Sequence, residues 1–210
     1  MAVMLSLKKL ALDVIVFVFL LVFFYVSHSW LASLSVKEFI SKYSQLMFSF
    51  YRLFYTLFSV TLWSIITWWF IYQHEYNYII TPRTGLMYTG YVMAAVGLLL
   101  ISLSVIKYGF QEFVGLNALN KNQRIENAAP ELNISGMNGF VRHPIYSGIL
   151  LALVGLFLCL PTQMTALGIV VSLIYLEIGI RLEEIKLEKE FGSSYTQYKM
   201  KVKKVIPRLY

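Results

Sequence analysis

The chain reads Pro161-Thr162-Gln163-Met164 between two apolar segments, residues 145–160 and residues 165–180. Because so short a connection joins helices as an antiparallel hairpin, the outer ends of the two segments must meet in space. Those ends carry Arg142 and His143 on one side, and Arg181, Glu183 and Glu184 on the other. Charged groups at a membrane edge are costly unless they are paired or bind something, so we expect chemistry at this meeting point.

The composition is that of a membrane protein. Of 210 residues, 58% are hydrophobic and only 14% are charged, which is outside the range of ordinary soluble domains. Crossing a bilayer takes roughly 20 apolar residues. The candidate spans are residues 10–27, 47–72, 86–106, 145–160 and 165–180. The sequence therefore predicts an all-α integral membrane protein with about five transmembrane helices, a hairpin of spans four and five, and a cytoplasmic C-terminal amphipathic helix.

We expect a single membrane domain over residues 1–210. Residues 1–106 hold the first three spans, residues 107–144 form a cytoplasmic loop, and residues 145–210 form the hairpin and the C-terminal helix. Lys8 and Lys9 before an apolar run resemble the start of a signal peptide, but no small-x-small cleavage site follows, which favours a retained anchor. The lone Cys159 excludes an intrachain disulfide and a cysteine metal cluster, so no metal site is predicted.

The net charge of +7 is concentrated in two regions. Positive-inside reasoning places both on the cytoplasmic side. They are the C-terminus, with Lys199, Lys201, Lys203, Lys204 and Arg208, and the loop before residue 145, with Lys107, Lys121, Arg124 and Arg142. The C-terminus is expected to contact anionic membrane lipids, and no nucleic-acid module is present. The absence of targeting signals favours a bacterial inner membrane.

Pro144 fixes the backbone around His143. A residue before proline avoids the helical region, so His143 should be extended, just before a helix that Pro144 opens. Such a helix start offers unpaired backbone N–H groups and a positive dipole end, which suit a carboxylate or the polar part of a cofactor. Glu177, Arg181, Glu184 and Glu188 share one face of the facing helix, and Glu177 and Arg181 should form an ion pair. Gly192 should break that helix, and a serine should cap the next one.

The order of these motifs carries a family resemblance. Arg-His-Pro-x-Tyr-x-Gly at 142–148 is followed by Arg-x-Glu-Glu at 181–184, Phe-Gly-x-x-Tyr-x-x-Tyr at 191–198 and Ile-Pro at 206–207. This resembles the integral membrane methyltransferases related to isoprenylcysteine carboxyl methyltransferase and phospholipid methyltransferase. The resemblance implies S-adenosylmethionine bound on the cytoplasmic side by a cofactor loop at residues 107–144 and a catalytic hairpin within residues 145–210. It also implies a tunnel to the bilayer for a lipophilic acceptor. The cofactor-binding residues that it implies are Arg142, His143, Pro144, Tyr146, Gly148, Glu183 and Glu184.

The N-terminal half is similar to a narrower group. Ser27-His28-Ser29, Tyr51-Arg52-x-x-Tyr55 and Phe113-x-Gly115-Leu116 resemble the NnrU-like proteins and the bacterial methanethiol S-methyltransferases. This second resemblance favours a small thiol as acceptor. The superfamily often has an aromatic residue where this chain has Asn138. The resemblance implies that this position belongs to the segment that covers the cofactor, so the chain departs from the family there.

Methyl transfer from a sulfonium needs positioning and a dry site more than acid–base groups. Glu183 or Glu184 can pair with the cofactor's ammonium, while His143, Tyr146 and nearby N–H groups can hold its carboxylate and ribose. The predicted catalytic residues are Arg181, Glu184 and His28. Arg181 would orient an anionic acceptor or only brace Glu177. His28 would take the proton of a thiol acceptor, or only form an interfacial hydrogen bond.

Other functions stay open from the sequence. The acceptor could be a prenylcysteine carboxylate or a phospholipid amine. Membrane sterol reductases share a related tyrosine pattern but use a nicotinamide cofactor, and an NnrU-like protein could be non-catalytic. The intact Arg-His-Pro and the two glutamates favour the methyltransferase, and cofactor binding would discriminate among all three classes.

Overall fold

The computed structural model describes residues 2–72, 78–107, 109–116 and 132–210. Within these ranges the chain is mostly helical and contains no strand, and Val141 and Lys203 form an isolated bridge. The helices are α1 (Ala2–Ala32), α2 (Leu34–Tyr43), α3 (Gln45–Tyr72), α4 (Thr84–Lys107), α5 (Phe110–Val114), the 3₁₀ helix η2 (Gly136–Gly139), α6 (Pro144–Cys159), α7 (Gln163–Phe191) and α8 (Ser193–Lys201). The predicted all-α membrane fold is confirmed.

Four of the described helices are long and apolar enough to cross a membrane: α1 from Lys8, α3, α4 and α7. α6 is shorter, with 16 residues and therefore a length of about 24 Å. α7 continues to Phe191, beyond the predicted end of the fifth span at residue 180. Its 29 residues extend about 44 Å, so its last turns must project past a hydrocarbon core of about 30 Å.

The chain divides into two compact units. The first contains α1, α2, α3, α5 and the first residues of α7, and the second contains α4, α6, the rest of α7 and α8. The predicted cofactor loop at residues 107–144 includes α5 and η2, and its residues 117–131 lie outside the described part of the chain.

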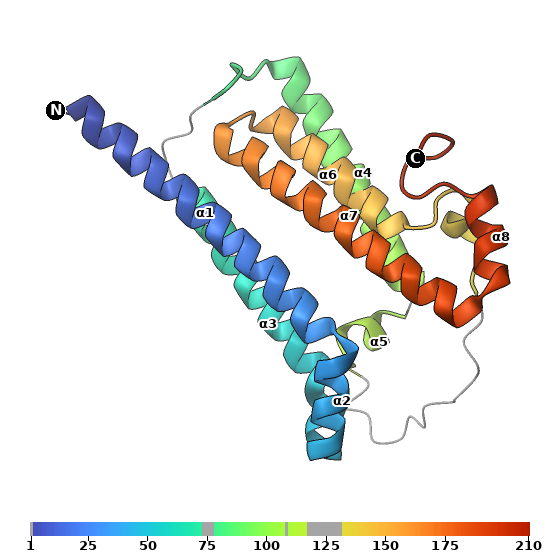
Figure 1. The fold of residues 1–210 in the computed structure, drawn as a ribbon. Helices are drawn as coiled ribbons and strands as arrows, with labels where there is room; N and C mark the ends of the chain where they lie inside the picture. Colours follow the sequence, from blue (N-terminus) through green and yellow to red (C-terminus); the bar gives the residue numbers. More distant parts are fainter. Residues whose placement is uncertain (1, 73–77, 108, 117–131) are drawn as a thin grey trace. The chain divides into compact units, whose positions relative to one another are not determined.

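In the first unit α1 and α3 run antiparallel, side by side (Figure 1). Phe17, Leu21 and Ile66 form its buried core, and the Phe17 and Phe70 rings lie 5.6 Å apart. The Tyr51 hydroxyl donates a hydrogen bond to the Leu31 carbonyl oxygen and so fixes the opposite end of the helix pair.

In the second unit glycines bring α4 and α6 together as antiparallel neighbours (Figure 1). A Cβ atom on Gly97 would lie 2.6 Å from the Gly148 carbonyl oxygen, and one on Gly90 would lie 2.7 Å from that of Gly155. Only residues without a side chain allow backbones so close. The packing of α6 on α4 therefore explains why residue 148 is glycine.

The segment after α7 folds back onto the start of α6. Gly192, with φ +55°, ends α7 and is itself the N-cap of α8, so the predicted break is confirmed. The prediction of a serine cap is wrong, because the cap position is Gly192 and no side chain caps α8. The Tyr198 hydroxyl then donates to the Asn138 carbonyl oxygen at 2.6 Å, and Ser147 Oγ donates to the Val205 carbonyl oxygen at 2.6 Å.

Candidate functional site

The His-Pro turn opens α6 as predicted. His143 has φ −124° and ψ 71°, which is non-helical, and Pro144 occupies the first turn. However, the Arg142 N–H donates to the Lys203 carbonyl oxygen at 2.8 Å, and the His143 N–H donates to that of Lys204 at 3.0 Å. The segment after α8 thus uses two of the backbone groups that the sequence offered to a ligand.

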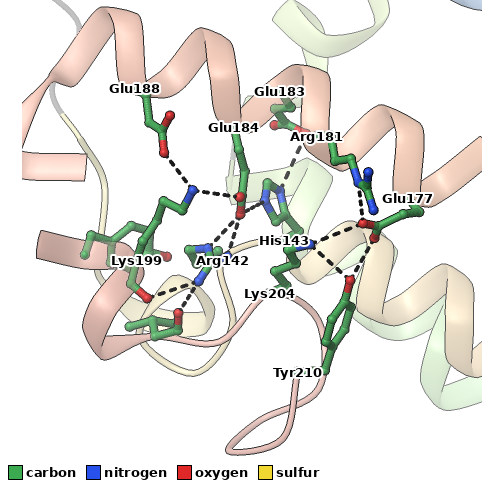
Figure 2. Close-up of polar contacts among 12 residues, drawn as sticks. Arg142, His143, Glu177, Arg181, Glu183, Glu184, Glu188, Lys199, Lys204 and Tyr210 are labelled. Atoms are coloured by element: carbon green, nitrogen blue, oxygen red, sulfur yellow. Dashed lines mark hydrogen bonds and ion pairs between the residues drawn. The ribbon is translucent and has the colours of Figure 1, made fainter. Parts of the chain in front are cut away.

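Glu184 is the centre of a buried ionic cluster (Figure 2). Arg142 donates to Glu184 Oε1 from Nε at 2.8 Å and from Nη2 at 2.6 Å, and Lys199 Nζ lies 3.2 Å from Oε2. The side chains of Arg142 and Glu184 are only 7% and 8% exposed. Arg142 Nη1 also donates to the Val202 carbonyl oxygen at 2.5 Å. The Glu184 carboxylate therefore compensates two cations of the protein itself.

His143 lies between the two glutamates at the predicted meeting point. Its Nε2 is 3.2 Å from Glu184 Oε1, and its Nδ1 is 3.5 Å from Glu183 Oε2 (Figure 2). His143 is buried, whereas the Glu183 side chain is 46% exposed. Of the two carboxylates, Glu183 is the one with a face open to a ligand.

A second group of polar contacts surrounds Glu177, which lies about two turns before Glu184 on α7. The predicted Glu177–Arg181 pair is present, with Arg181 Nε 2.7 Å from Glu177 Oε1. Lys204 Nζ lies 3.4 Å from the same oxygen, and the Tyr210 hydroxyl donates to Oε2 at 2.9 Å. Arg181 thus braces Glu177, and its side chain remains 71% exposed.

Two residues of α8, Tyr195 and Lys199, belong to the site although the sequence did not assign them to it. The Tyr195 hydroxyl is buried and has no hydrogen-bond partner among the described residues. Burial raises the pKa of Tyr195, and the charge of Glu184 raises it further. Hydrogen bonding to Glu188 at 2.6 Å raises the pKa of Lys199, and its contact with Glu184 adds to the rise. Tyr195 belongs to the Phe-Gly-x-x-Tyr-x-x-Tyr motif at 191–198, and this motif was the sequence feature that could have pointed to it as a site residue.

Of the other predicted residues of the second unit, some contact the ionic cluster and others lie away from it. The Tyr146 ring packs edge-on against the His143 imidazole, with centroids 5.6 Å apart. Gly148 faces α4 rather than the ionic cluster. Asn138, at the position of the departure from the resemblance, donates from Nδ2 to the Asn133 carbonyl oxygen at 2.7 Å and so shapes the loop before α6.

His28 belongs to the first unit and has polar partners there. Its Nε2 lies 2.6 Å from the Tyr55 hydroxyl, and its Nδ1 lies 3.1 Å from Ser59 Oγ. The motifs of the N-terminal resemblance converge at this end of α1 and α3, where a Cβ on Gly115 would lie 2.6 Å from the Leu53 nitrogen. That His28 acts on the same substrate as the ionic cluster stays a prediction.

The described residues contain no group of three or more His, Cys, Asp or Glu side chains that could hold a metal ion.

The chain is 46% identical over 71 residues to Methanethiol S-methyltransferase 1 of Bradyrhizobium diazoefficiens, a match that covers 32% of this chain. The match spans only 23% of that protein's length. No protein-family model matches the chain, and no solved structure matches it. The similarity supports a relationship with membrane methyltransferases.

Proposed function

We propose that this protein is a membrane methyltransferase that uses S-adenosylmethionine and transfers the methyl group to a small thiol. The observation that carries the proposal is the cluster of Arg142, His143, Glu183 and Glu184 where α6 and α7 meet. Its motifs are those of the resemblance, and the chain is similar to a methanethiol S-methyltransferase over part of its length. We place the protein in a bacterial inner membrane with this cluster facing the cytoplasm and the basic C-terminus against anionic lipids.

The residues of the cluster fit the polar end of S-adenosylmethionine. Glu183 offers a half-exposed carboxylate for an ammonium, beside the imidazole of His143. Tyr195 offers a buried hydroxyl that lacks a partner among the described residues, and leaving such a group unsatisfied costs about 1–3 kcal/mol. A ligand that accepts a hydrogen bond from Tyr195 recovers this cost. Glu184, held by Arg142 and Lys199, positions His143 rather than the ligand.

When bound, S-adenosylmethionine supplies a methyl group on a sulfonium, which a thiolate takes by in-line displacement while the bonding electrons return to the donor sulfur. The acceptor thiol must first lose its proton, and His28 is the proposed base, with Tyr55 and Ser59 orienting its imidazole. Arg181 presents an exposed guanidinium that can orient the thiolate. The apolar helices exclude water from the reacting atoms.

Ligand binding tests the cofactor assignment directly. Calorimetry of the purified protein in detergent should show micromolar binding of S-adenosylhomocysteine and no binding of NADPH.

Glu183→Gln should weaken the binding of S-adenosylhomocysteine at least tenfold, because the ligand's ammonium loses its counter-charge, which is worth more than about 1.4 kcal/mol. Glu184→Ala should also weaken it at least tenfold, by releasing His143. Glu190→Gln, an exposed change on the same helix, is the control. Binding of NADPH instead would indicate the reductase class.

Methyl transfer tests the acceptor. Membranes that contain the protein, given labelled S-adenosylmethionine, should methylate methanethiol above the level of the Glu183→Gln variant. Transfer only to phosphatidylethanolamine or to a prenylated cysteine carboxylate would contradict the thiol while keeping the methyltransferase. Absence of any cofactor binding would favour a non-catalytic protein.

A further inference from the structure

A small pocket lies beside the ionic cluster, between α6, α7 and the segment that follows α8. Its volume is about 120 Å³. Aliphatic side chains form most of its wall, and Glu177 is the one charged residue among those that line it. The lining residues that matter here are Tyr146, Leu150, Leu176, Ile180, Val205 and Tyr210.

The volume limits what the pocket can hold. An apolar cavity of about 150 Å³ accommodates a molecule the size of benzene. The pocket is slightly smaller, so it can enclose a thiol or sulfide of a few heavy atoms but not a prenyl or acyl chain. Its apolar wall favours a weakly polar ligand, since a strongly hydrated one would lose more solvation than the wall returns.

The polar edge of the pocket suits a sulfur that must ionise. Glu177 lines the pocket with one negative charge, while Arg181 and Lys204, which lie outside the lining but contact its carboxylate, contribute two positive charges. The local balance is therefore positive, which lowers the cost of a thiolate. Tyr146 belongs to the pocket wall and also packs on His143, so this side chain lies between the pocket and the proposed cofactor site.

We propose that this pocket binds the methyl-accepting thiol and that its size restricts the enzyme to thiols of one to about three carbons. The inference rests on the proposed function, and it adds the position of the acceptor and the reason for its selection. Leu176 on α7 controls the depth of the pocket, because its side chain is buried and lines it.

Changing Leu176 in both directions tests the size rule. Leu176→Phe should lower kcat/KM for methanethiol at least tenfold, and Leu176→Ala should raise the ratio of kcat/KM for butanethiol to that for methanethiol at least tenfold. Ile178→Phe is the matched control, because Ile178 lies on the same helix, is 53% exposed and does not line the pocket. Unchanged S-adenosylhomocysteine affinity would show that each variant is folded. The same chain-length profile in every variant would overturn the inference while leaving thiol methylation intact.

Cysteine labelling gives a readout that needs no catalysis. In Leu176→Cys, dimethyl sulfide should slow modification by methyl methanethiosulfonate at least fivefold, whereas Ile178→Cys should be modified at a rate that the sulfide does not change. Cys159 is buried, and the wild type measures its background. Protection without any methyl transfer would support the pocket and contradict the proposed activity. Equal labelling rates with and without the sulfide would remove the pocket from acceptor binding.

Discussion

At the scale of single residues, burial separates two glutamates that are neighbours in the sequence. Glu184 points into the protein, where Arg142, His143 and Lys199 surround its carboxylate, while Glu183 is half-exposed beside His143. A buried charge that already has two cationic partners serves mainly to hold them in place. This division assigns positioning to Glu184 and ligand contact to Glu183.

The two glutamates should therefore differ in their effect on stability. Glu184→Gln leaves Arg142 buried without a counter-charge and should cost about 3–5 kcal/mol. Glu183→Gln should cost less than about 1 kcal/mol, because its carboxylate is half-exposed. Thermal unfolding in detergent, without ligand, measures both. Equal losses in the two variants would contradict the division of roles.

Lys199 gives a pH dependence whose sign is fixed. Contacts with Glu188 and Glu184 raise the pKa of Lys199 above its usual value of about 10.4, so the folded state holds this proton more tightly than the unfolded state. The stabilisation is fully present below the unfolded pKa and is lost as pH rises through the folded one. Lys199→Met should reduce stability by about 1 kcal/mol at pH 8, and the difference from wild type should shrink above pH ~10.4. Unfolding midpoints across this range test the trend, and a difference that stays constant would contradict it.

The sequence identified the positions of this cluster but not the division of roles within it. Motif spacing brought His143 to Glu183 and Glu184, since a short connection forces the ends of a hairpin together. The burial of Glu184 could not be predicted, because it depends on Lys199 and on the Lys203 and Lys204 carbonyl groups. These groups follow the helix break at Gly192, and the sequence pattern does not give the direction of the chain after that break. The buried Tyr195 hydroxyl and the contact of Tyr210 with Glu177 were missed for the same reason.

At the scale of elements, the second unit depends on close contact between α4 and α6. Gly90 and Gly97 on α4 face Gly155 and Gly148 on α6, and in each pair a backbone carbonyl oxygen lies within 2.7 Å of an added Cβ. Backbone cannot move aside as a flexible side chain does, so the two helices would have to separate. The apolar runs predicted both helices. They could not predict which faces meet, because a helix that is apolar on every side has no amphipathic pattern to mark its buried face.

A single methyl group should therefore disrupt this contact. In Gly97→Ala the new Cβ would lie 2.6 Å from the Gly148 carbonyl oxygen and 2.7 Å from the Ala152 nitrogen, so we expect a loss of about 1–3 kcal/mol. Gly85→Ala on the same helix is the control, since nothing lies within 4 Å of its Cβ position, and it should be neutral or slightly stabilising. Unfolding midpoints compare the two. A loss in Gly85→Ala as large as that in Gly97→Ala would contradict the packing explanation, because alanine favours a helix more than glycine does.

At the scale of the whole molecule, hydropathy predicted most of the long helices that the structure shows. The apolar blocks became α1, α3, α4, α6 and α7, each within a few residues of its predicted bounds except α7 and α1, which are longer. α7 runs on because its charged face carries helix-supporting pairs such as Glu177 with Arg181, so the helix does not stop where the apolar residues do. The length of an apolar run therefore reflects the thickness of the hydrocarbon core and not the full length of the helix.

The length of α7 leads to a prediction about its orientation. About 20 residues from Gln163 cross the hydrocarbon core, which leaves Glu183, Glu184 and the following turn beyond it on the side of α8. Five lysine and arginine residues between 199 and 208 favour the cytoplasm for that side. In right-side-out vesicles, a cysteine at Ser194 should react with an impermeant maleimide only after permeabilisation, and one at Gln163 should react at once. Both positions are exposed in the structure, so access depends on the membrane alone. The reverse labelling would place the ionic cluster outside the cell, away from cytoplasmic S-adenosylmethionine, and would contradict the proposed function together with the topology.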